Sequence, residues 1–510
     1  MDKVNEFEHG IDSNSKDGVN VNFVTFPIEA NFHYRFSSAE DLLNNFDTLA
    51  AMIQDHNEVQ VPRLQVLDEY SKARNTNILR NQRRKEEGKA DHRAAHNFGK
   101  VICRFDVGYN TGNPVKVKAA SEDSQKVIDE FNANNDIDGL NSELWLDIDK
   151  YGRAYEIHYR DEDDTDYVDL ANVFETFVVY DTTIKREPIL AVSYPKAQFN
   201  KNADKSRILP VIYTADETIY FQETKIDAVK LVEDRRDSHA HKEVPVVEHA
   251  SDRFRLGIYE DVLSLNDLYD SAQSDTANYM TDLNDALLVI SGDIEAAGLT
   301  AEDAAKQKEA NMLLLESGVD MNGNKTSVTA GYIYKQYDVQ GVEAHKDRIK
   351  KNIYEIAMVP NLTDENFSGN VSGEAMKYKL FGFQQMTATK QRLFKKALMR
   401  RYRLLFNLKQ EVNEVTNADL KGMEITFIPN LPKAILEELK ALVDSGVEFS
   451  QETLLGLASF IENVRDEIER INKEKTDARK DPAFDFDNVT NPSLKKEEVP
   501  AIEKAGDVNE

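Results

Sequence analysis

Charge is sorted along this chain, and the sorting constrains the fold more than any other feature of the sequence. Eleven Asp and Glu residues but no Lys or Arg lie between Leu256 and Ala305. Ten Lys and Arg residues but no acid lie between Ala375 and Gln410. Both stretches also carry apolar residues at helical spacing, so they predict two long helices of opposite charge.

The acidic stretch predicts a helix from Ile258 to Ala286, roughly 43 Å long at about 1.5 Å per residue. Its apolar positions recur every three or four residues and form one stripe, while most of its acids fall on the opposite face. If such helices were aligned around a ring of subunits, the wall of the pore would be uniformly negative. That wall would repel the phosphates of DNA and offer no point of attachment.

The basic stretch predicts a helix over roughly 374–415. One interpretation is that acids of neighbouring elements neutralise its Lys and Arg side chains. The other is that these side chains contact DNA directly. We favour the first, because Leu and Phe residues surround the charges closely along the whole stretch.

Overall composition excludes several classes of protein. The 510 residues include 91 acids and 63 bases, for a net charge of −28, which disfavours a general electrostatic grip on nucleic acid or on an anionic membrane. The single cysteine, Cys103, excludes an intrachain disulfide and a cysteine-based zinc site. We find no apolar run long enough to span a bilayer, and no signal peptide is expected.

The rest of the chain predicts an α+β fold in which long helices accompany antiparallel strands. Residues 151–225 alternate β-branched and aromatic runs with turn residues, which indicates several antiparallel strands. The insert at 287–337 indicates three strands and one helix, and a polar, Gly-containing loop follows at 361–375. Further helices are expected at 37–57, 64–73, 78–100, 123–150, 341–358 and in two segments after Pro432, with a strand-like piece at 101–119.

Catalytic and metal-binding motifs are weak. Residues 318–326 approach a phosphate-binding loop, but Asn324 interrupts the pattern and a hairpin turn is the better interpretation. Residues 134–145 match only the first half of a calcium loop, because Trp145 stands where a bidentate Glu must be. A histidine–carboxylate group could hold a metal, although its spacing is not that of ligands on a helix; it consists of His239, His241, Glu243, Glu248 and His249.

Four stretches, taken in order, resemble the portal (connector) proteins of tailed bacteriophages, most closely the SPP1 type. RAAHNFGKVICRFDVGYNTGNPVKV at 93–117 is similar to a segment of the family, and 140–163 followed by 178–194 is similar to the wing strands. Residues 244–292 resemble the beginning of the stem and clip, and 427–457 resemble the beginning of the crown. The resemblance covers about 40–475.

The resemblance implies a portal fold with wing, stem, clip and crown regions, assembled as a ring of typically twelve subunits. It divides the chain into a mobile N-terminal arm (1–37), wing (38–252), first stem helix (253–286), clip (287–337), second stem helix (338–359), tunnel loop (360–373), a spine helix and strand between wing and crown (374–430), crown helices (431–475) and a disordered tail (476–510).

The resemblance also implies a function. Double-stranded DNA would be packaged through the ring by the terminase and ejected through it on infection, without sequence specificity. The implied location is the portal vertex of the virion, with assembly in the host cytoplasm. The implied partners are the terminase large subunit, head-completion or adaptor proteins, and the major capsid and scaffold proteins. No catalytic residue, metal, cofactor or membrane is expected.

Candidate site residues follow from this map. The acidic candidates for the channel wall are Glu260, Asp267, Asp270, Asp275, Asp282 and Asp285. The tunnel-loop candidates to face DNA are Asn361, Asp364, Asn366, Ser368, Asn370 and Ser372, and those of the second stem helix are Lys346, Lys350 and Lys351. The clip candidates to face the terminase are Glu302, Lys306, Asn322 and Lys325.

Two other functions stay open at this stage. The chain could be a capsid scaffold or head–tail adaptor without a DNA channel. Less favoured is a metal-dependent nuclease that uses the histidine–carboxylate group at 239–249.

Overall fold

The structure is a computed structural model that forms two compact units, Met1–Leu431 and Pro432–Glu510. It describes residues 26, 28–79, 90–161, 163–196, 206–282, 287–291, 302, 323, 329–333, 338–361, 378, 380–411, 421–430 and 464–478.

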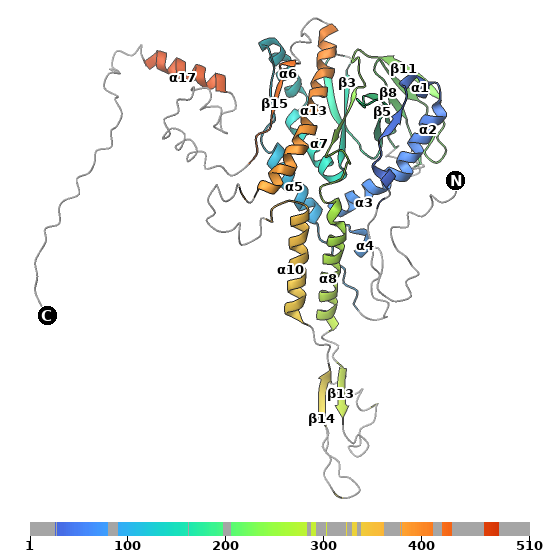
Figure 1. Ribbon diagram of the computed structural model, residues 1–510, viewed down its shortest axis with the longest axis vertical. Helices are drawn as coiled ribbons and strands as arrows, with labels where there is room; N and C mark the ends of the chain where they lie inside the picture. Colours follow the sequence, from blue (N-terminus) through green and yellow to red (C-terminus); the bar gives the residue numbers. More distant parts are fainter. Residues whose placement is uncertain are drawn as a thin grey trace, which may run out of the picture. The chain divides into compact units, whose positions relative to one another are not determined.

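Helices dominate the first part of the larger unit (Figure 1). Four of them begin at a residue whose side chain accepts a hydrogen bond from a backbone N–H of the first turn, namely Ser38, Asn45, Asn97 and Ser121. The elements are η1 (Ile28–Asn31), β1 (Tyr34–Phe36), α1 (Ala39–Leu43), α2 (Phe46–Asp55), η2 (His56–Gln60), α3 (Val61–Ser71), α4 (Thr76–Leu79), α5 (Phe98–Thr111), β2 (Lys116–Lys118), α6 (Glu122–Asn134) and α7 (Ile137–Tyr151).

Helix α5 corrects the expectation of a strand-like piece over 101–119. Its buried residues recur at helical spacing, as Phe98, Ile102 and Tyr109 illustrate, and this period overrides the β-branched local composition. Only β2 is a strand in this stretch, and it pairs with β15 (Glu424–Thr426). The helix expected over 78–100 is also wrong in part, because α4 ends at Leu79 and residues 90–97 have no regular secondary structure.

Antiparallel strands follow α7, as the sequence predicts. They are β3 (Arg153–Arg160), β4 (Asp166–Ala171), β5 (Thr176–Asp181), β6 (Pro188–Ser193), β7 (Arg207–Ile208), β8 (Val211–Tyr213), β9 (Glu217–Phe221), β10 (Thr224–Lys225), β11 (Glu233–Ser238) and β12 (Val246–Ala250). One sheet has the order β1-β5-β6-β8-β9-β11 and another the order β12-β3-β4. The parallel pairing of β1 with β5 joins segments far apart in the sequence, which local patterning does not predict.

The acidic helix and its partner bracket a hairpin. The order is η3 (Glu260–Val262), α8 (Leu263–Asp282), β13 (Leu287–Ser291), β14 (Thr329–Ile333) and α10 (Val339–Ile356). β13 and β14 are antiparallel, with Val289 opposite Gly331. The regular α-helix thus begins a turn later than expected, after a 3₁₀ turn, and residues 283–286 lie outside the described residues.

The basic stretch forms α13 (Phe381–Glu411), slightly shorter than the expected 374–415. Its Phe394, Leu398 and Tyr402 enter a core cluster with Trp145 of α7 and Ile128 of α6. Helix α13 therefore shares this core cluster with α6 and α7.

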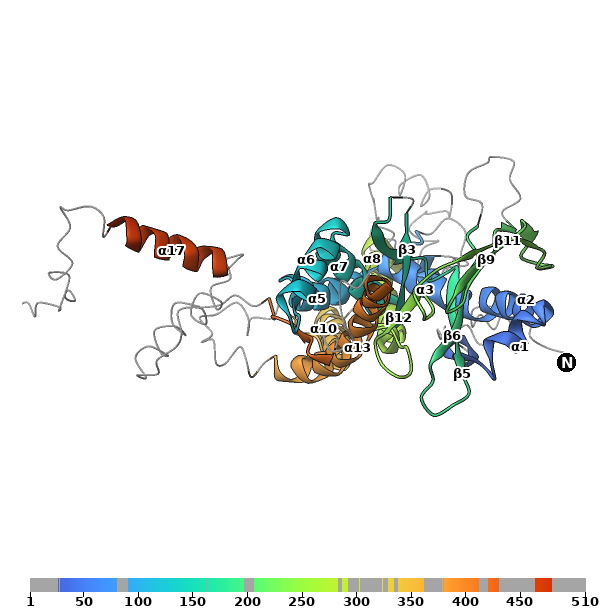
Figure 2. The same cartoon turned by 90° about the horizontal axis from the view of Figure 1, so that it is seen from above.

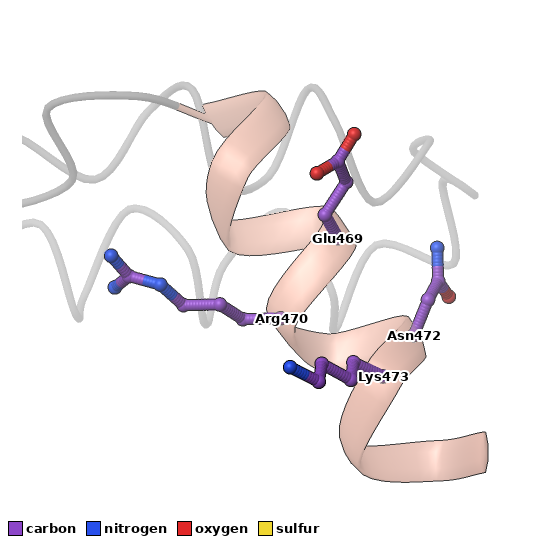
Figure 3. A pocket seen from close by; sticks show the side chains of 4 residues that line it. All are labelled: Glu469, Arg470, Asn472 and Lys473. Carbon is purple, nitrogen blue, oxygen red and sulfur yellow. The ribbon is translucent and has the colours of Figure 1, made fainter.

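The smaller unit is described only over α17 (Val464–Ala478). Figure 3 shows the side chains that line a hollow on this helix, which are Glu469, Arg470, Asn472 and Lys473. All four are exposed and come from one helix, so the hollow lacks the enclosure of a small-molecule site.

Candidate functional site

Helices α8 and α10 lie side by side and form the candidate stem (Figure 1). Ile349 and Ile353 of α10 are buried, so an apolar seam contributes to the pairing. Lys346 of α10 is buried too, and its Nζ donates to Gln273 Oε1 of α8 at 3.1 Å. The same Nζ lies 2.5 Å from Glu343 Oε1, which balances its charge.

Polar side chains along α8 form a ladder of hydrogen bonds with the backbone of residues 92–96. Asp270 Oδ1, Ser274 Oγ and Asn278 Oδ1 accept hydrogen bonds from the backbone N–H groups of His96, Ala94 and His92, at 2.9, 2.9 and 2.7 Å. Four helical residues rise roughly 6 Å and two extended residues span roughly 6.6 Å, so the two spacings match. The ladder therefore fixes residues 92–96 to α8 in one register.

This ladder corrects the expectation that the acids of α8 form one open face. Asp270 is fully buried and also accepts from His96 Nδ1 at 2.7 Å and from Asn266 at 3.1 Å. Asp267 is buried and accepts from Tyr70 Oη at 2.6 Å and from Asn77 at 2.7 Å. These carboxylates satisfy donors that would otherwise be buried without partners, so their oxygens make hydrogen bonds within the subunit.

Burial shows in the acid–base behaviour of the same two carboxyl groups. Burial raises the pKa of Asp267 to about 6. The nearby Asp270 adds to this shift, whereas the hydrogen bonds from Tyr70 and Asn77 oppose it. Burial also raises the pKa of Asp270, although hydrogen bonds from His96 and Asn75 oppose the shift. Neither group is a freely solvated charge.

The other acidic candidates differ from these two. Glu260 pairs with the buried Arg63, with Nε to Oε1 at 2.8 Å, and accepts from the Gly257 N–H at 3.0 Å. Asp275 is exposed. Asp282 is the last residue of α8, but its side chain and all of Asp285 lie outside the described residues.

The remaining candidates are described only in part. On α10, Lys346 is buried, Lys350 is half-buried and Lys351 is exposed, 3.6 Å from Glu355. Asn361 is half-buried and Glu302 is exposed. The tunnel-loop candidates Asp364, Asn366, Ser368, Asn370 and Ser372, and the clip candidates Lys306, Asn322 and Lys325, lie outside the described residues.

Several bases of α13 are neutralised by acids of neighbouring elements, as favoured from the sequence. Lys390 Nζ lies 2.5 Å from both Asp106 of α5 and Asp149 of α7, and all three side chains are buried. Burial opposes the charge of Lys390, but the two carboxylates outweigh it and raise the pKa of the ammonium. Burial and Asp106 raise the pKa of Asp149 well above its ordinary value.

A second buried ion pair joins α13 to β3. Arg401 Nε lies 3.1 and 3.0 Å from the two carboxylate oxygens of Glu156, and its Nη1 donates to Asn141 at 2.8 Å. Burial alone would raise the pKa of Glu156, but Arg401, with His249 and His158, holds it well below its ordinary value. Helix α13 is thus joined to β3 by this ion pair, in addition to its apolar packing against α6 and α7.

The side chains of the histidine–carboxylate group do not point toward a common centre. Glu248 and His249 are successive residues of β12, so they point to opposite faces of the sheet. Glu248 pairs with Arg255, His249 Nε2 lies 3.2 Å from Glu156, and Glu243 lies 3.4 Å from Arg403. Within the part of the chain that the structure describes, no three His, Cys, Asp or Glu side chains are arranged to hold a metal ion.

Comparison with known families decides the identity. Residues 50–481 match the family described as phage portal protein, SPP1 Gp6-like. The chain belongs to this portal family. A search of curated proteins found no match.

Membership of the portal family confirms the resemblance inferred from the sequence, and it implies the portal fold. Portal proteins are structural and non-enzymatic, which removes the nuclease interpretation. None of the described helices combines the length and apolarity that a membrane crossing requires.

Sequence reasoning missed the two buried ion-pair sites and the α8 ladder. The ladder had a signal, because Asp270, Ser274 and Asn278 recur every four residues on one face of a predicted helix. The Asp106–Lys390–Asp149 site had none, since its three members are distant in the sequence.

Proposed function

We propose that this protein forms the portal ring at one capsid vertex. Double-stranded DNA is packaged through the ring by the terminase and later ejected through it, and the ring joins the head to tail-connector proteins. The observation that carries the proposal is the family match over 50–481. Support comes from the helix–hairpin–helix order of α8, β13, β14 and α10, which suits a channel stem with a terminal clip.

Within this proposal, α8 and α10 are the stem helices and the hairpin β13–β14 belongs to the clip that faces the terminase. Residues 360–373 are the tunnel loop that tracks DNA, α13 is the spine between wing and crown, and 431–475 form the crown. The subunit number is typically twelve, and the location is the portal vertex of the virion.

Negative-stain microscopy of the purified full-length protein tests the proposal. We expect rings with a central opening wide enough for duplex DNA. Particles without an opening, at concentrations where the protein oligomerises, would favour the scaffold or adaptor alternative.

Asp275→Lys is the informative substitution for the channel wall. Among the acidic candidates with described side chains, Asp275 is the exposed one on α8, so a new cation there would attract passing phosphates without opening a buried cluster. We expect normal rings and slower DNA packaging, measured as nuclease-protected DNA per procapsid. The exposed Asp227→Lys is the matched control. A packaging rate equal to wild type would remove Asp275 from the channel wall.

Asp270→Lys does not test the same point. It would place an ammonium in a buried site that accepts hydrogen bonds from His96 and Asn266, so loss of packaging would report damage to the fold.

A further inference from the structure

The bases of α13 divide into two sets. Lys390, Arg400, Arg401, Arg403 and Lys409 lie within 4 Å of carboxylates outside α13. Arg392, Lys395 and Lys396 are exposed, and among the described residues no carboxylate forms an ion pair with them. These three residues lie within about one helical turn of each other and are called the basic face below.

A complementary surface lies on α6 and the turn that follows it. Six acids and one base occur from Glu122 to Asp138. Glu122, Asp129 and Glu130 are exposed, and no ion pair with a base is described for them. Asp136 and Asp138 continue the exposed acids beyond the helix, and burial together with Asp136 raises the pKa of Asp138. These five residues are called the acidic face.

The two faces point in opposite directions. Helix α6 buries Ile128 and Phe131, and α13 buries Phe394 and Tyr402, in one shared cluster. Tyr402 Oη also donates to Asn132 of α6 at 3.0 Å, so the inner sides of the two helices meet. Each helix therefore presents its outer side away from the other, and Figure 2 shows α6 and α13 on opposite sides of this part of the larger unit.

We propose that the basic face of one copy packs against the acidic face of the next copy. Two different, complementary patches on opposite sides of a subunit make a head-to-tail interface, which closes into a ring when the rotation permits. The proposal rests on the proposed ring and adds the surfaces that join its subunits.

Net charge favours a second copy over DNA as the partner. Each chain carries −28, so copies repel one another unless the contacting surfaces have opposite signs. The basic face is positively charged and the acidic face is negatively charged, and both faces belong to the same chain. A phosphate backbone drawn to the basic face would instead have to approach a strongly negative protein.

Charge reversal tests the interface. Variant A carries Lys395→Glu and Lys396→Glu, and variant B carries Asp129→Lys and Glu130→Lys. We expect each alone to weaken assembly about tenfold or more, because like charges would meet at every contact. An equimolar mixture of A and B should recover rings, since each altered face then meets an oppositely charged one. A chain with all four substitutions should recover them as well.

Mass photometry and negative-stain images measure the fraction of protein in rings, and circular dichroism checks that each variant is folded. Lys225→Glu with Lys230→Glu is the matched control for variant A, with the same change in net charge around β10. Anisotropy of a labelled duplex measures DNA binding in parallel.

Three results would overturn the inference. If wild type forms rings and variant A does too, the basic face is not the interface, and loss of DNA binding by variant A would assign that face to DNA. If A and B each fail but neither the mixture nor the fourfold variant recovers rings, the faces do not meet. If wild-type protein forms no rings, the proposed portal assembly fails together with the interface.

Discussion

Replacing Lys390 with methionine should lower the free energy of unfolding by about 3–5 kcal/mol at neutral pH. The ammonium lies 2.5 Å from both Asp106 and Asp149, and all three side chains are buried. Methionine keeps much of the volume and removes the charge, so the two acidic side chains stay buried without a cation. A buried, uncompensated carboxylate is costly, and it reduces the cost by binding a proton.

The pH dependence of this loss has a definite sign. Burial and Asp106 already raise the pKa of Asp149, and Lys390 opposes that shift, so without Lys390 the folded-state pKa of Asp149 should rise further above that of the unfolded chain. An acid with a raised folded pKa costs no stability below its unfolded pKa, and the cost grows as the pH rises from the unfolded pKa to the folded pKa. The difference between wild type and K390M should therefore be smaller at pH 5 than at pH 8.

Urea unfolding followed by tryptophan fluorescence measures both effects. Trp145 is the only tryptophan in the chain, is fully buried, and donates to Asp106 at 3.2 Å, so it reports on this region. Lys100→Met on the exposed side of α5 is the control, with an expected change within about 0.5 kcal/mol. A loss below 1 kcal/mol, or one independent of pH, would show that Lys390 does not compensate the two carboxylates.

Arg401→Met should cause a loss of similar size, about 3–5 kcal/mol, because it removes the two-pronged partner of the buried Glu156. Arg401→Lys should lose less, since an ammonium keeps the charge but cannot contact both carboxylate oxygens and Asn141 in the same geometry. The exposed Arg104→Met on α5 is the matched control.

Acidification should affect the stability contribution of the Glu156–Arg401 site differently from that of the Lys390 site. The pKa of Glu156 is held well below its ordinary value, so its contribution to stability is present above about pH 4.5 and is lost as the pH falls below that. The difference between wild type and R401M should therefore shrink on going from pH 5 to pH 3. Unfolding curves at fixed ionic strength would refute this if the difference stayed constant or grew.

Local sequence patterns predicted a large part of the fold. Helical spacing located α8, α10 and α13, and runs of β-branched and aromatic residues located β3, β5, β6, β8 and β9, whereas β4 and β11 were not predicted. Where prediction failed, at 101–111, the local composition was β-like but the burial pattern was helical. Element boundaries near Asn44 and Leu263 also differed, because a cap or a 3₁₀ turn depends on a few local hydrogen bonds.

The charges of the candidate site were harder to predict. Periodicity assigns each acid of α8 to a side of the helix, but it does not say what packs against that side. Asp270 and Asp275 look alike in the sequence, yet one accepts a hydrogen bond from a residue 174 positions away and the other is exposed. The same holds on α13, where Lys390 is buried between two carboxylates and Lys395 faces outward.

The sequence by itself therefore determined the α+β class, the two charge-sorted helices and the family. Only the tertiary structure decided which of those charges are held inside the protomer and which stay on its surface. The physical reason is that helix formation depends on neighbours within a few residues, whereas the environment of an ionisable group depends on whichever distant segment covers it. In this portal protein, coverage by distant segments separates the charges that stabilise the subunit from those that remain on its surface.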